Sequence, residues 1–293
     1  MKINTLSIVV PTSGCVNKCK FCVSKTHENN YCNLSKEKFT ERYNFYIKGI
    51  ESRLKYAVLH KVDTIILTGT GEPLQNREFL ILINDIITKL GNPFPRIELQ
   101  TSGVLLNDEN LKLLKQINVN TISLSISNLF DNNKNMETIG VIDKLKFNLE
   151  ELCNRIYSYD FNIRLSLNMV NDYIDISPER FFIKAKELNA AFITFRKLYF
   201  SDNGTKEDIW VKENKLSDDV LNDIMSYIKE KGSPLYKLPF GYVAYAVDEI
   251  STLFDDNCMD SIETDADDVL KYLILREDGK LYCKWDDKGS LIF

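Results

Sequence analysis

The sequence has no long hydrophobic run, no excess of positive charge and few cysteines, and each shortage excludes a class of protein. Its longest early apolar stretch, residues 3–10, is interrupted by Asn4 and Thr5. That stretch is too short to span a bilayer and lacks the layout of a secretory signal, so we expect a cytoplasmic protein with no membrane contact. The net charge of −5 gives no general signal for nucleic-acid binding, and we do not expect a nucleic acid as partner.

The seven cysteines are too few for a disulfide scaffold in a chain of 293 residues, and their number is odd. Three of them, Cys15, Cys19 and Cys22, fall within eight residues. Crowded cysteines without an export signal are more often metal ligands than disulfide partners. The rest of the composition, 44% hydrophobic and 27% charged, is sufficient for a sizeable core.

Short apolar segments alternate with helical patterns, which predicts a parallel sheet with right-handed crossovers. The segments are rich in Ile, Leu and Val, as strands covered on both faces tend to be. Six strands are fewer than the eight of a closed barrel. We therefore expect an α/β fold with a partial (β/α)6 TIM-type barrel, and an open doubly wound sheet is the alternative. The strands are expected at residues 4–10, 64–68, 97–101, 121–127, 162–170 and 191–198.

Three helices have clear signals in the sequence. Apolar residues at helical spacing predict one helix over residues 39–58, with Ser35 as its N-cap, and a second over residues 142–156. The run Ser177-Pro178-Glu179 has the order of a cap, a first helical residue and a favourable acid, so a third helix is expected to begin there.

The pattern changes after about residue 232. Residues 1–232 are expected to form the barrel, and residues 233–293 a small α+β extension packed on it. Asp278-Gly279 between two apolar segments predicts a β-hairpin in this extension. The segment 255–268 contains only acids among its charged residues, so the extension is strongly acidic.

The three crowded cysteines have the spacing C-x3-C-x2-C directly after the first predicted strand. A short loop of this kind can bring its thiolates onto one iron–sulfur cluster. Three ligands on a four-iron cluster leave one iron open, as chemistry requires. A closed site with Cys32 as fourth ligand, holding zinc or an electron-transfer cluster, is the alternative, although Cys32 stands alone rather than in a second pair.

This spacing, with aromatic Phe21 before the last cysteine, resembles the signature of the radical S-adenosylmethionine (radical SAM) superfamily. Residues 68–74, Thr-Gly-Thr-Gly-Glu-Pro-Leu, follow the second strand, where that superfamily carries a Gly-Gly-Glu-Pro segment. Thr70 stands in place of the first glycine. Small residues in such a turn let backbone carbonyls approach an ammonium group, and the proline stiffens the turn. The resemblance extends over residues 5–200.

The resemblance implies two cofactors, a [4Fe–4S] cluster and S-adenosyl-L-methionine (SAM). Cys15, Cys19 and Cys22 are then the cluster ligands. The site is expected at the carboxyl ends of the strands, as in other barrels of this type. The residues carried over as SAM contacts are Phe21, Gly69, Thr70, Gly71, Glu72, Ser102, Ser123, Ser125, Asn168 and Asn171.

The implied function is an enzyme that cleaves SAM reductively to a 5′-deoxyadenosyl radical, which abstracts hydrogen from a small molecule, nucleoside or peptide. The alternative is a non-catalytic Fe–S or zinc module for electron transfer or interaction. The glycine-rich turn favours the enzyme, because a simple cluster carrier has no need of it. Lys18, Lys20 and Lys25 form a basic collar around the cysteine loop that we expect to dock a flavodoxin or ferredoxin reductant.

Several chemically capable residues have no assigned role. His60 is expected to be structural at the end of the first helix, and His27 is a candidate for the active site because it lies near the cluster. Two cysteines in the extension are too few for a second cluster. The cysteines left without a role are Cys32, Cys153, Cys258 and Cys283.

Overall fold

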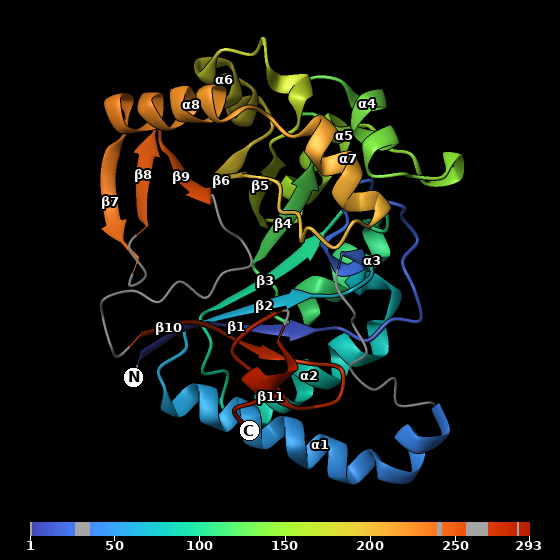
Figure 1. Ribbon diagram of the computed structural model, residues 1–293. Coiled ribbons are helices and arrows are strands. Elements are labelled where there is room, and N and C mark those ends of the chain that lie inside the picture. Colours follow the sequence, from blue (N-terminus) through green and yellow to red (C-terminus); the bar gives the residue numbers. More distant parts are fainter. Residues whose placement is uncertain (1, 27–35, 239–241, 256–268, 286) are drawn as a thin grey trace.

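The computed structural model describes residues 2–26, 36–238, 242–255, 269–285 and 287–293, which form one 11-stranded sheet in the order β11-β10-β1-β2-β3-β4-β5-β6-β9-β8-β7 (Figure 1). The strands are β1 (Lys2–Val9), β2 (Thr64–Thr68), β3 (Arg96–Thr101), β4 (Thr121–Ile126), β5 (Asn162–Asn168), β6 (Ala190–Arg196), β7 (Ser233–Lys237), β8 (Val243–Val247), β9 (Ile250–Asp255), β10 (Val269–Leu275) and β11 (Leu281–Tyr282).

The six predicted strands are confirmed as β1 to β6, each parallel to its neighbour. The sheet curves but does not close, in agreement with the expected partial TIM-type barrel. It is longer than expected, because β10 pairs in parallel with β1 and β9 pairs in parallel with β6. Figure 1 shows these two added edges, β10 with β11 below and β9 with β8 and β7 above.

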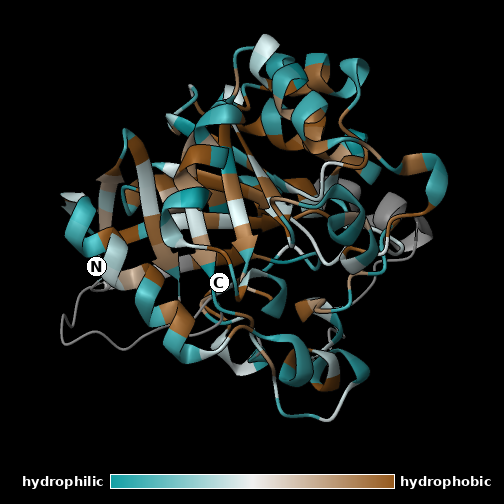
Figure 2. Cartoon of the chain, turned by 90° about the horizontal axis from the view of Figure 1, so that it is seen from above, coloured by the Kyte–Doolittle hydropathy of each residue, from teal (hydrophilic) through white to brown (hydrophobic). Residues whose placement is uncertain are grey.

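Helices cover the outer side of the curved sheet (Figure 1). Hydrophobic and hydrophilic residues are mixed along the helices (Figure 2), and in α2, α3 and α5 the apolar residues form the buried side. The α-helices are α1 (Lys36–Leu59), α2 (Arg77–Lys89), α3 (Asp108–Gln116), α4 (Asn132–Thr138), α5 (Leu149–Ser158), α6 (Pro178–Glu187), α7 (Lys206–Asn214) and α8 (Asp218–Lys231).

The expectation that the strands are apolar on both faces is wrong for the inner face. On β3, Ile97 and Leu99 are buried in the main core, whereas Arg96, Glu98 and Gln100 line a cavity on the inner side. The same alternation occurs on β5 and β6. Successive side chains of a strand point to opposite faces, so one strand can serve the core and the cavity together.

The helix predicted over residues 142–156 begins later than expected. Ile142 and Lys146 have extended backbone, residues Asp143–Leu145 form only a 3-10 turn, and α5 starts at Leu149. Asn148 is its N-cap, since its side-chain oxygen accepts the Glu151 N–H at 3.1 Å. The cap decides where the helix starts. Upstream of it, Leu145 packs on the core from the 3-10 turn, whereas Ile142 is exposed.

The other two helix predictions are confirmed. α1 contains residues 39–58, while its predicted cap, Ser35, lies outside the described residues. α6 has Ser177 at its N-cap position and Pro178 as its first residue, although the Ser177 side chain makes no capping hydrogen bond. Proline alone is well suited there, because its missing N–H has no partner within the helix.

The predicted hairpin in the C-terminal extension is also confirmed. β10 and β11 are antiparallel, and Gly279 in the connecting turn has a φ of +75°, which suits glycine. The extension does not stand beside the sheet but adds strands to both of its edges. The boundary at residue 232 stays a prediction. Among the described residues, no helix combines the length and apolar character needed to cross a membrane.

We expect that weakening β10 destabilises the entire chain. Leu273 on β10 is fully buried, lies opposite Leu6 of β1 and belongs to the main core. Leu273→Ala should lower the free energy of unfolding by about 2–5 kcal/mol, because it leaves a cavity. Urea denaturation should show one cooperative transition at a lower midpoint.

The matched control is Leu235→Ala on β7, where the side chain is half exposed and its loss should change stability little. A separate low-stability transition in Leu273→Ala, with the barrel transition unmoved, would contradict this view of a shared sheet.

Candidate active site

Loops at the carboxyl ends of β1 to β6 enclose a cavity of about 290 Å³. The cysteine loop follows β1, the glycine-rich turn follows β2, and polar side chains from β3 to β6 complete the wall. The structure brings together all but one of the residues expected as cluster ligands or SAM contacts. The predicted residues that line the cavity are Cys15, Cys19, Phe21, Cys22, Gly69, Thr70, Gly71, Glu72, Ser102, Ser123, Ser125 and Asn168.

Asn171 is the exception. It lies in a 3-10 turn (Asn171–Tyr173) after β5, is exposed, and is not among the residues that line the cavity. β5 ends at Asn168 rather than at Val170 as predicted, so the chain has already left the cavity rim when it reaches Asn171. Asn168 remains in place, buried, with its side-chain NH2 donating to Ser125 Oγ at 3.1 Å.

The cysteine loop is held from outside by the end of α4. The Lys18 N–H donates to the carbonyls of Ile139 and Gly140, and the Lys20 N–H donates to the Thr138 carbonyl at 3.0 Å. Gly140 has a φ of +63°, and a Cβ on it would lie 2.5 Å from the Lys18 carbonyl oxygen. Only glycine fits this approach, so residue 140 fixes where the loop sits.

The three loop cysteines are free thiols. Burial, followed by the proximity of the other two thiols, raises the pKa of Cys19 to about 12; burial also raises the pKa of Cys15. A cation bound between these sulfurs is therefore the natural stabiliser of their charged form.

The spacing of these sulfurs bears on the kind of metal site. Within the described part of the chain, no three Cys, His, Asp or Glu side chains are grouped closely enough to hold one metal ion. Ligands of a single zinc ion must converge at about 2.3 Å from it. The three sulfurs line one cavity and are thiolate donors of the kind that bind iron–sulfur clusters.

The turn after β2 lies directly against the cysteine loop. A Cβ on Gly71 would lie 2.4 Å from Thr12 Oγ1 and 2.5 Å from the Gly14 carbonyl oxygen, far inside contact distance. Next to it, the Thr12 hydroxyl is buried, and no described residue forms a hydrogen bond with it. The absence of a side chain at residue 71 is thus what allows the two loops to meet.

Glu72 is the hub that joins the ends of β2 and β3. Its carboxylate is 3% exposed and accepts hydrogen bonds from the Thr101 hydroxyl at 2.7 Å, the Ser102 hydroxyl at 2.8 Å and the Ser102 N–H at 3.1 Å. Burial raises its pKa, and these hydrogen bonds oppose the rise. Because its oxygens are occupied by the chain's own donors, Glu72 acts by positioning the turn.

Asn17 extends this network to the cysteine loop. Its side-chain NH2 donates to Ser102 Oγ at 2.7 Å, and its backbone N–H donates to Cys15 Sγ at 3.5 Å. Its side-chain oxygen is buried without a partner among the described residues, although Asn17 lines the cavity. No local pattern singles out this residue, because its role depends on a contact with a residue 85 positions away.

Thr70, which departs from the glycine of the superfamily pattern, has a partner of its own. Its hydroxyl donates to Glu277 Oε1, at 3.3 Å, in the turn of the C-terminal hairpin. Its carbonyl accepts from Ser24 Oγ at 3.0 Å, and Ser24 Oγ lies 3.0 Å from Cys22 Sγ. The substitution therefore ties the extension to the cysteine loop.

Aromatic rings close the cavity on the β6 side. Phe21 packs against Trp210 of α7 with ring centroids 6.2 Å apart, and Tyr199 lines the wall after β6.

Of the collar lysines, Lys20 pairs with Glu137 at 2.8 Å and Lys25 with Glu207 at 3.8 Å. Lys18 is exposed.

The remaining candidates lie elsewhere. Cys153 is fully buried in the core, and Cys283 follows the C-terminal hairpin. The His60 ring lies 4.3 Å from that of Tyr56, in a structural position. His27, Cys32 and Cys258 lie outside the described residues.

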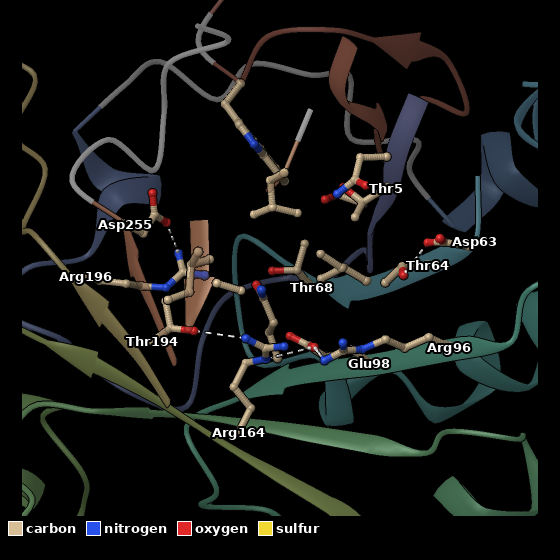
Figure 3. A pocket seen from close by; sticks show the side chains of 18 of the residues that line it. Thr5, Asp63, Thr64, Thr68, Arg96, Glu98, Arg164, Thr194, Arg196 and Asp255 are labelled. Carbon is tan, nitrogen blue, oxygen red and sulfur yellow. Dashed lines mark hydrogen bonds and ion pairs between the residues drawn. The ribbon is translucent and has the colours of Figure 1, made fainter. Parts of the chain in front are cut away.

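A second, larger cavity of about 670 Å³ continues from the first along the inner face of the sheet; we call it the lumen. Gln100, Gly69, Thr70 and Arg196 line both. Figure 3 shows that Arg96, Glu98, Arg164 and Arg196 approach it from β3, β5 and β6, and Asp255 from β9.

The charged residues of the lumen were not predicted from the sequence. They could have been recognised, because Arg96, Glu98, Arg164 and Arg196 lie in or next to strand segments that are rich in apolar residues. A charged residue on a parallel strand inside a barrel faces either a partner or a ligand.

Comparisons with known proteins identify the family and the fold. A sequence model described as the Radical SAM superfamily matches residues 9–181, more than half of the chain. The uncharacterized protein MJ0804 of Methanocaldococcus jannaschii is 30% identical over 154 residues, which cover 46% of this chain and 52% of that protein. The chain thus spans about half the length of this relative.

Solved structures show the same fold at low identity. SuiB of Streptococcus suis, bound to S-adenosylmethionine, is 15% identical with a TM-score of 0.60, covering 96% of this chain and 60% of that one. SuiB bound to the precursor peptide SuiA has a TM-score of 0.58 at 16% identity, covering 96% of this chain and 59% of that one. The structure of anSMEcpe with bound AdoMet has a TM-score of 0.58 at 14% identity, covering 99% of this chain and 77% of that one.

The contact at Gly71 leads to a direct prediction. Gly71→Ala should push the turn away from the cysteine loop, because backbone and Thr12 leave no room for a methyl group. Such overpacking costs about 1–3 kcal/mol. We expect a lower melting temperature and less iron retained per chain after anaerobic reconstitution with iron and sulfide.

Gly49→Ala is the matched control, because that glycine lies in α1 and its added methyl group would meet only the flexible end of Arg53. Equal iron content and stability in Gly71→Ala and wild type would show that the close approach has no importance.

Proposed function

Because the chain belongs to the radical SAM superfamily, we propose that it is an enzyme that binds a [4Fe–4S] cluster and cleaves SAM reductively in the 290 Å³ cavity at the carboxyl ends of β1 to β6. The observation that carries the proposal is the convergence of three free cysteines and the glycine-rich turn on this one cavity. The two motifs lie about 50 residues apart in the sequence.

The residues present fit the cluster. Three thiols line one cavity, and Asn17 beside them keeps a buried oxygen that has no partner among the described residues. Cys15, Cys19 and Cys22 would hold three irons. When bound, the reduced cluster supplies one electron to SAM, whose cleavage yields methionine and a 5′-deoxyadenosyl radical.

The residues also fit SAM. Gly69 and Gly71 line the cavity, and their lack of side chains lets the turn pack against the cysteine loop, which leaves backbone groups of the turn at the cavity wall for the ligand's amino acid part. Ser102, Ser123, Ser125 and Asn168 supply hydroxyl and amide groups along β3 to β5. Phe21 supplies an apolar wall, held in place by Trp210. These residues bind and orient the ligand, and the surrounding loops limit access of water.

A non-catalytic cluster carrier is the less favoured reading. Such a protein needs a shell around its cluster but no second cavity open to it. Here the lumen of about 670 Å³ joins the cysteine-lined cavity, so a substrate has room beside SAM. We propose that the substrate, a small molecule, nucleoside or peptide, enters there. The neighbour bound to a precursor peptide makes a peptide one of the candidates.

The direct test is production of 5′-deoxyadenosine. After anaerobic reconstitution and reduction with dithionite, the chain should release 5′-deoxyadenosine and methionine from SAM, measured by chromatography. Cys19→Ala should lose both cluster absorbance and product, because a ligand is missing. Cys283→Ala is the control and should retain both, since Cys283 does not line the cavity.

Two results would contradict the proposal. One is a full cluster without SAM binding or 5′-deoxyadenosine in the wild-type chain. The other is a normal cluster and normal product in Cys19→Ala.

We propose that a flavodoxin- or ferredoxin-like reductant docks beside the cysteine loop. Lys20 and Lys25 already pair with acids of this chain, so exposed Lys18 is the lysine of the collar left to attract an acidic partner.

The rate of cluster reduction by flavodoxin should therefore fall with added salt and fall several-fold in Lys18→Glu at low salt. Lys112→Glu, on the exposed face of α3, is the matched control and should leave the rate unchanged. Stopped-flow absorbance measures these rates. A rate independent of salt, with no difference between the two variants, would exclude this docking site.

A further inference from the structure

We propose that the lumen binds an oxyanion group of the substrate, a carboxylate or a phosphate, through Arg164 and Arg196; this rests on the proposed function, because it assigns the substrate class of that same site. The inference follows from the geometry of the charged side chains in Figure 3. Among the described residues, the carboxylates of the lumen do not use all the N–H donors of its arginines.

The first observation concerns one shared carboxylate oxygen. Glu98 Oε2 accepts hydrogen bonds from both Arg96 NH2, at 2.9 Å, and Arg164 Nε, at 3.1 Å. The Glu98 side chain is 6% exposed and that of Arg164 is 15% exposed. Two partly buried guanidinium groups thus share a single buried carboxylate, and a second anion would be favourable beside them.

The second observation concerns donors without acceptors. The Nε atoms of Arg96 and Arg196 are buried and have no hydrogen-bond partner among the residues that the structure describes. Arg196 NH1 lies 3.7 Å from Asp255 Oδ2, which is an ion pair but too long for a good hydrogen bond. A guanidinium has five N–H donors, so these side chains retain capacity to bind a planar or tetrahedral oxyanion.

The third observation is that the arginines are held in place. The guanidinium carbons of Arg96 and Arg164 both lie 4.7 Å from the centre of the Phe192 ring. Arg164 NH1 also donates to Thr194 Oγ1 at 3.0 Å. Such prior ordering lowers the entropy cost of binding an anion.

The position of Arg196 connects the anion to the chemistry. Arg196 lines both the lumen and the cavity with the cysteines, and in the sheet it lies between Asn168 of β5 and Asp255 of β9. An anionic group held here and at Arg164 places the rest of the substrate next to the proposed SAM site. The same arginines would disfavour cationic substrates.

Two variants should change anion affinity in opposite directions. Arg164→Gln removes a donor and should weaken binding of inorganic phosphate or succinate by about tenfold or more. Glu98→Gln removes the competing carboxylate while keeping its shape, and should strengthen binding of the same probe. Arg77→Gln is the control, since it loses an equal charge on α2, where Arg77 pairs with Glu109 outside the lumen.

The experiment uses the reconstituted full chain at constant ionic strength. Isothermal titration calorimetry with sodium phosphate and, separately, sodium succinate gives the affinities, with sodium chloride as the blank. The two probes distinguish a phosphate from a carboxylate ligand. The increase in melting temperature with each probe provides a second readout. If Arg164→Gln does not fold, the affinity of Glu98→Gln for the probe tests the anion site by itself.

Opposite shifts in the two variants, with Arg77→Gln unchanged, would support the anion site. Wild-type protein that binds neither probe, or variants that bind it with equal affinity, would overturn it and leave a purely structural ion-pair network. SAM binding and 5′-deoxyadenosine are measured in the same samples. If SAM binding and 5′-deoxyadenosine are absent while the anion still binds, only the proposed function is contradicted. If both are present while no anion binds, only this inference is contradicted.

Discussion

The close approach of two backbone segments at Gly71 is the constraint on which the site depends. The turn after β2 can lie against the cysteine loop only because residue 71 lacks a side chain, and a Cβ there would meet both Thr12 and the Gly14 carbonyl. Once the loops meet, Glu72 joins the turn to the end of β3, and Asn17 joins β3 back to the cysteine loop. The site is thus held by a closed ring of contacts.

The outer face of the sheet stabilises the fold, and the inner face lines the cavities. The outer face packs Ile, Leu and Val under the helices, whereas the inner face carries hydroxyl, amide and charged groups into two connected cavities. The C-terminal extension takes part in both. β10 completes the sheet beside β1, Asp255 of β9 pairs with Arg196, and Glu277 accepts a hydrogen bond from Thr70. This explains why a threonine can stand where the superfamily pattern has glycine.

Much of this arrangement could be predicted from the sequence, for identifiable physical reasons. The six central strands have strong apolar patterns, and the cysteine spacing and glycine-rich turn are local motifs that lie next to each other once parallel strands are assumed. The start of α5 was misplaced, because the capping by Asn148 outweighs the apolar periodicity of Ile142 and Leu145. The parallel pairing of β9 and β10 with the core could not be foreseen, since it joins segments far apart in the chain. The roles of Asn17 and Arg196 depend on such long-range contacts as well.

The central claim is that three cysteines hold a four-iron cluster whose remaining iron binds SAM. Mössbauer spectroscopy of the chain reconstituted with ⁵⁷Fe, before and after addition of SAM, tests it most directly. The account predicts that the parameters of one iron in four change when SAM is added, while the other three keep those of thiolate-bound irons. Four irons that are all unaffected by SAM would contradict it.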